Sequence, residues 1–62
     1  MKRADLIRKI EEAGCKFVRH GGNHDWYSNP KTGISQPIPR HRDINESLAK
    51  HILKKLVPSL WD

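Results

Sequence analysis

Both ends of the chain contain apolar residues that recur at helical spacing. Near the N-terminus an apolar residue returns every three or four positions, and charged side chains fill the positions between. This spacing predicts an amphipathic helix over residues 3–13, followed by Gly14, where a helix C-terminus favours a left-handed backbone. The apolar positions are Leu6, Ile7, Ile10 and Ala13.

A second helix is predicted near the C-terminus. Asn45 is a suitable N-cap residue, and Glu46 in the first turn suits the positive end of the helix dipole. Pro58 ends the pattern. The apolar stripe consists of Leu48, Ile52, Leu53 and Leu56. The other face carries Lys50, Lys54 and Lys55, which are spaced to face solvent or phosphate together.

Three extended segments are predicted between the helices, at residues 15–20, 24–28 and 34–38. Gly21 and Gly22 separate the first two, and an Asn, Pro and Gly cluster at residues 29–33 separates the last two. Pro37 suits an edge strand, because proline donates no hydrogen bond to a sheet. The order α-β-β-β-α predicts an α+β fold with a three-stranded antiparallel sheet and both helices on one face. The other face is then free to meet a ligand.

Composition narrows the function classes. The 62 residues suffice for a single domain, residues 1–62, and a hydrophobic fraction of 35% implies a thin core without an enclosed cofactor pocket. Twelve Lys and Arg against seven Asp and Glu give a net charge of +5, which favours a polyanionic partner. No apolar run is long enough for a membrane span or a signal peptide. Cys15 is the single cysteine, as expected in a reducing cytoplasm.

The stretch Gly21-Gly22-Asn23-His24 carries the strongest candidate chemistry. Glycines permit a tight turn and the close approach of a ligand. The imidazole of His24 can give or take a proton near neutral pH. The alternative is an ordinary Gly-Gly hairpin followed by a surface histidine, and spacing by itself leaves both interpretations open.

Several motifs taken in order resemble HicA toxins, the small ribonuclease partners of HicB antitoxins. They are the glycine, asparagine and histidine ending at His24, the turn with Pro and Gly, the step Pro39-Arg40-His41, and the helix over residues 46–56. The resemblance implies a fold similar to double-stranded-RNA-binding domains. It also implies that His24 is the catalytic histidine. Many members read Gly-Ser-His or Gly-Gly-His, so Asn23 is an extra residue here.

The resemblance implies a toxin of a type II toxin–antitoxin system that cleaves mRNA in the cytoplasm. The ribose 2′-hydroxyl is the nucleophile, so His24 need only act as general acid or base, with no metal ion or small-molecule cofactor. Gly22 and Asn23 are expected to shape its loop and to bind RNA. A HicB-like antitoxin is the expected protein partner, covering the active site, and no membrane is involved.

Three further residues are expected to contact RNA phosphates. Arg19 lies opposite His24 on the same sheet face if Gly21 and Gly22 form a two-residue turn, whereas a longer loop breaks this pairing. Arg40 and His41 lie in a basic cluster after the third strand, and His41 is also a candidate second proton-transfer group. Each has a plain alternative as a solvated residue.

The sequence leaves two alternative functions open. The first alternative is a non-catalytic basic RNA-binding module of the same fold, which holds RNA without cutting it. A zinc site is the second alternative, although the spacing of its candidate ligands fits no usual pattern. Those ligands are Cys15, His20, His24, His41 and His51. Trp26 and Tyr27 should point to opposite sheet faces, and Trp61 should be a packing or partner contact.

Overall fold

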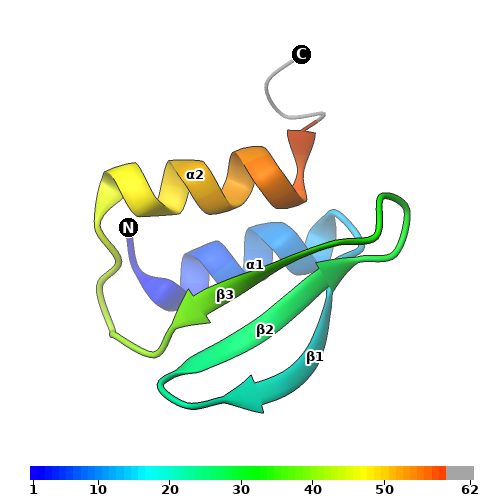
Figure 1. The fold of residues 1–62 in the computed structure, drawn as a ribbon. Helices are drawn as coiled ribbons and strands as arrows, with labels where there is room; N and C mark the ends of the chain where they lie inside the picture. Colours follow the sequence, from blue (N-terminus) through cyan, green and yellow to red (C-terminus); the bar gives the residue numbers. More distant parts are fainter. Residues whose placement is uncertain (59–62) are drawn as a thin grey trace.

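The computed structural model describes residues 1–58 and confirms the predicted order of elements. These are α1 (Arg3–Glu12), β1 (Lys16–Gly21), β2 (His24–Asn29), β3 (Ile34–Pro39) and α2 (Glu46–Leu56). Figure 1 shows α1 and α2 together on one side of the sheet. The predicted α+β class with two helices on one sheet face is therefore confirmed. Trp61 lies outside the described residues.

The strands follow one another in the order β1-β2-β3, and both pairs are antiparallel. Pro37 lies in the edge strand β3, as predicted. The first hairpin differs from the expectation, because Gly21 pairs with His24 and the turn residues are Gly22 and Asn23. Gly22 has a φ of 58°, a conformation that glycine adopts at little cost. The first strand begins at Lys16, whereas the sequence predicts a start at Cys15.

The two faces of the central strand β2 differ because successive side chains point to opposite sides of a sheet. The side chains facing the helices are Asp25, Tyr27 and Asn29, and all three are buried. The side chains facing away are His24, Trp26 and Ser28, which are exposed or partly exposed. We call these sides the helix face and the open face.

The core lies between the helices and the sheet, on the helix face of β2 and β3. Its most deeply buried side chains are Leu6, Ile10, Ile38, Ile52 and Leu56. In contrast, β1 contributes no buried residue. The helices therefore stabilise β2 and β3 directly, whereas β1 is held mainly by its pairing with β2.

The helix ends follow the predicted capping chemistry. The Asn45 side chain accepts a hydrogen bond from the backbone nitrogen of Ser47 at 2.8 Å, so the predicted N-cap is confirmed. Gly14 has the predicted left-handed backbone, with a φ of 98°. α1 ends at Glu12, one residue before the predicted end, because Ala13 forms the C-cap. Within residues 1–58, neither helix is long and apolar enough to cross a membrane.

Candidate active site

His24 is the first residue of β2 and lies on the open face. Its side chain is exposed. It pairs with Gly21 of β1 on one side and with Pro39 of β3 on the other. His24 is exposed, so a ligand on the open face can reach its imidazole.

Arg19 and Trp26 share the open face with His24. Arg19 pairs with Trp26, so the expected pairing of Arg19 with His24 is wrong. The observed turn at Gly22 and Asn23 moves the pairing by two residues along β1, which keeps Arg19 on the same face but diagonal to His24. The guanidinium carbon lies 5.2 Å from the centre of the Trp26 ring, within the range of a cation–π contact.

Gly21 leaves the space in which these two side chains lie. A Cβ atom built on Gly21 would be 2.8 Å from Nε1 of Trp26 and 3.1 Å from Nη1 of Arg19. Both polar groups therefore lie directly over the residue that pairs with His24. The open face thus brings together an imidazole, a guanidinium and an indole N–H group, which suits binding of an anionic group.

The helix face beneath His24 carries a second charged group, built around Asp25. The Asp25 carboxylate accepts hydrogen bonds from Arg3 Nη2 at 2.7 Å, from Arg40 Nε at 3.0 Å and from His20 Nδ1 at 2.6 Å. Arg3 also donates from Nε to the backbone oxygen of Pro39, at 2.9 Å. We call Arg3, His20, Asp25 and Arg40 the Asp25 cluster. It ties α1, β1, β2 and the segment after β3 together at the end of the sheet where His24 lies.

The surroundings of Asp25 favour its ionised form. The hydrogen bond from His20, followed by the hydrogen bond and charge of Arg40, holds the pKa of Asp25 below its ordinary value, and partial burial opposes this. A carboxylate whose pKa is lowered by folding stabilises the folded state above its unfolded pKa of about 3.9. That contribution is lost as the pH falls through the lower pKa of the folded state.

We expect the stability difference between the wild type and Asp25→Asn to shrink on acidification. Urea unfolding at about pH 6 and about pH 3 should show a larger difference at the higher pH, because protonated Asp25 binds its three partners less well. Asp5→Asn is the control, because the Asp5 side chain is 44% exposed and makes only a 3.3 Å ion pair with Arg8. A difference independent of pH for Asp25→Asn would contradict the expectation.

Two surface hollows are lined by residues that the sequence predicts to contact phosphate or RNA. Asn23, Arg40 and His41 line a shallow groove beside the first hairpin, so three of the predicted RNA-contacting residues lie together. The guanidinium of Arg40 is bound to Asp25 on the helix face, whereas Arg19 lies on the open face with His24. The predicted contacts are thus divided between the two sides of the sheet.

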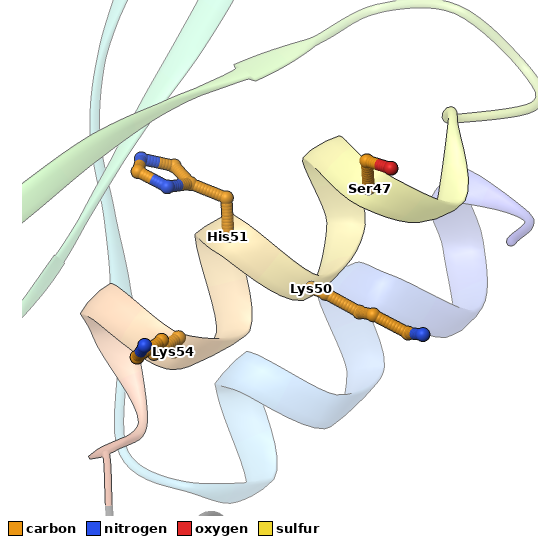
Figure 2. Close-up of a pocket in the computed structure, with 4 residues that line it drawn as sticks. All are labelled: Ser47, Lys50, His51 and Lys54. Carbon is orange, nitrogen blue, oxygen red and sulfur yellow. The ribbon is translucent and has the colours of Figure 1, made fainter.

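The other hollow lies on the outer surface of α2. Figure 2 shows its lining side chains, Ser47, Lys50, His51 and Lys54, projecting from successive turns of the helix. Lys50 and Lys54 lie together as predicted, and Lys55 is exposed outside this lining.

The candidate zinc ligands do not converge. Cys15 is buried and donates from Sγ to the backbone oxygen of Leu56, and burial raises the pKa of its thiol. His20 lies on the helix face and His24 on the open face. Within residues 1–58, no three His, Cys, Asp or Glu side chains lie close enough to share a metal ion.

Sequence reasoning missed the Asp25 cluster and the role of Gly21. His20 entered the prediction only as a zinc candidate, and Asp25 did not enter it. The available signal was the alternation along β2, which places a charged residue among buried positions directly after His24. A buried carboxylate requires cationic partners, and the chain has an excess of them.

Comparison with known proteins identifies a family. A family model described as the HicA toxin of bacterial toxin–antitoxin systems matches residues 3–56, which cover both helices and all three strands. Comparison with curated proteins and with solved structures gave no match. Because the match spans most of the 62 residues, it extends to the whole fold. The chain belongs to the HicA toxin family, whose members act in toxin–antitoxin systems and so have an antitoxin partner.

Proposed function

We propose that this chain is an endoribonuclease that cleaves mRNA, with His24 as general acid and base. The observation that carries the proposal is the position of His24. Its imidazole is exposed on the open face, beside a glycine whose space is filled by the polar ends of Arg19 and Trp26. RNA fits this arrangement, because each phosphodiester has a neighbouring 2′-hydroxyl that can serve as nucleophile.

In this mechanism His24 removes the proton of the 2′-hydroxyl, and the 2′-oxygen forms a bond to phosphorus as the bond between phosphorus and the 5′-oxygen breaks. The protonated His24 then returns that proton to the departing 5′-oxygen. A positioned acid or base contributes typically about 10²–10⁴-fold to the rate. Negative charge grows on the phosphoryl oxygens as the 2′-oxygen attacks phosphorus. Arg19 stabilises this charge from the same face, and the Trp26 indole donates a hydrogen bond toward it.

The remaining predicted residues position the substrate. Gly22, with its positive φ, forms the tight turn, and Asn23 leads directly into His24. Asn23, Arg40 and His41 line the groove along which the RNA strand continues. The nucleophile belongs to the substrate, so the proposed reaction requires no metal ion or cofactor.

The partners follow from the same proposal. Residues 1–62 act as one toxin domain in the cytoplasm, where mRNA is translated. The antitoxin is HicB-like and blocks cleavage by covering the open face around His24. The net charge of +5 favours an acidic surface on that partner.

A cleavage assay in excess EDTA tests this function. The wild type should cut single-stranded RNA and leave the same sequence intact when every ribose carries a 2′-O-methyl group, because that group removes the nucleophile. Adding the partner antitoxin should stop the cutting. Cleavage of the methylated strand would contradict the mechanism, and binding of RNA without cleavage would instead favour a non-catalytic RNA-binding module.

A further inference from the structure

The exposed side of the Asp25 cluster has unused hydrogen-bonding capacity. The His20 side chain is 71% exposed and that of Arg40 is 45% exposed, whereas the Asp25 side chain between them is 12% exposed. Among residues 1–58, His20 Nε2 and Arg40 Nη1 have no hydrogen-bond partner. Two nitrogen atoms therefore face solvent from groups whose other ends are fixed on one carboxylate.

The geometry determines which nitrogen of His20 carries a proton. Nδ1 lies 2.6 Å from Oδ1 of Asp25, and an ionised carboxylate only accepts hydrogen bonds, so Nδ1 donates. The 3.2 Å approach of Arg40 Nη2 to the same Nδ1 is therefore a close contact between two donors. In the neutral imidazole Nε2 is then an acceptor, and it becomes a donor only when the ring is protonated.

The charge of the cluster is unbalanced. One carboxylate faces the guanidinium groups of Arg3 and Arg40, so the cluster carries a net positive charge even when His20 is neutral. Protonation of His20 adds a second excess charge. Arg3 is committed to Asp25 and Pro39, so Arg40 and His20 present the excess charge to solvent.

The Asp25 cluster is next to the proposed cleavage site along the first hairpin. His20 pairs with Asp25, and the next pair along the hairpin is Gly21 with His24. His20 and His24 lie on opposite faces, so their rings do not share one phosphate. Arg40 also lines the groove with Asn23, the residue before His24, which joins the two faces around the end of the hairpin.

We propose that Arg40 and protonated His20, both oriented by Asp25, bind a phosphate of the RNA strand that flanks the scissile one. The strand then passes around the end of the hairpin, with the scissile phosphate at His24 on the open face and its neighbour on the helix face. Arg40 donates from Nη1 and His20 from Nε2. The site requires the imidazolium, so RNA binding through it strengthens as the pH falls.

The pH dependence of this site comes from His20, whose ring is in contact with groups from several elements. Asp25 of β2 and Arg40 after β3 both contact Nδ1 of its ring, and Arg3 of α1 reaches it through Asp25. Phe17 of β1 packs against the ring, with centroids 4.8 Å apart. A lower pH favours a protonated imidazole, whereas a guanidinium group stays charged in proteins.

Binding of a short 2′-O-methyl RNA, which cannot be cleaved through its 2′-oxygen, tests the proposal. We expect the wild type to bind about two- to fivefold more tightly at about pH 6 than at about pH 8. His20→Asn keeps a donor at the position of Nδ1 but lacks Nε2, so it should bind more weakly than the wild type at about pH 6. His20→Lys, which is charged at both pH values, should bind at about pH 8 as tightly as the wild type does at about pH 6.

His51→Asn is the matched control, because it removes an exposed imidazole from the outer surface of α2. It should retain the pH dependence of the wild type. In NMR titrations the ring resonances of His20 should move when the RNA is added at about pH 6. Equal affinity of His20→Asn and the wild type at about pH 6 would overturn the proposal, as would an equal loss in His51→Asn.

This inference rests on RNA as the substrate, and the binding and cleavage experiments separate the two proposals. If RNA is cleaved but its binding depends neither on His20 nor on pH, only the flanking phosphate site is contradicted. Binding that depends on His20, without cleavage of ordinary RNA, would contradict the nuclease and leave the phosphate site in place.

Discussion

Replacing His24 with alanine should lower the rate of RNA cleavage by about 10²–10⁴-fold, the range typical of a lost general acid or base. The fold should be unaffected, because the His24 side chain is exposed and makes no hydrogen bond within residues 1–58. Its free energy of unfolding should change by less than about 0.5 kcal/mol. Initial cleavage rates in excess EDTA, measured with urea unfolding of the same samples, check both statements.

His51→Ala provides the matched control for His24→Ala. His51 is also exposed, but it belongs to α2 and lies on the outer surface of that helix (Figure 2). This variant should cleave RNA within a few-fold of the wild-type rate. Cleavage by His24→Ala at the wild-type rate would refute the assignment of His24. A similar loss in both variants would show that general charge, and not one positioned imidazole, controls the rate.

Replacing Leu56 with alanine should destabilise the fold by about 2–5 kcal/mol, the usual cost of a cavity at a fully buried leucine. Leu56 is 0% exposed. A domain of this length has a total stability of about 3–9 kcal/mol, so the substitution removes a large part of it. The loss of cleavage activity should then follow the unfolded fraction, because Leu56 lies in the core and not on the open face.

Leu48→Ala tests whether this cost comes from burial. Leu48 lies in the same helix but is 39% exposed, so its replacement should cost less than about 1 kcal/mol. Chemical unfolding followed by circular dichroism gives both values. Equal destabilisation by the two substitutions would contradict the location of the core, since both remove the same atoms from α2.

The elements of the fold could be predicted because each depends on local patterns. The apolar spacing before Gly14, the cap at Asn45 and the proline at position 37 each favour a local structure through nearby backbone chemistry, and all three are confirmed. The turn of the first hairpin could not be predicted from local patterns. The chain offers Gly21, Gly22 and Asn23 as turn residues, and local preference does not select between adjacent pairs of them.

Pairing within the sheet decides that choice. Burial of Asp25, Tyr27 and Asn29 on the helix face requires His24 and Trp26 on the open face, but both turns satisfy this requirement. With the turn at Gly22 and Asn23, Gly21 then lies opposite His24, where its missing side chain makes room for Trp26. Arg19 stays on the predicted face but moves along it, because the pairing changes by an even number of residues.

The sequence by itself determined the order of elements and the basic charge, since these depend on neighbouring residues and on composition. Its resemblance to HicA toxins implied His24 as the candidate catalytic residue. Only the tertiary structure decided which distant residues meet. Arg3, His20 and Arg40 converge on Asp25 from three other parts of the chain. A carboxylate that is largely removed from water must be paired with cations, and only the folded chain determines which cations lie within reach.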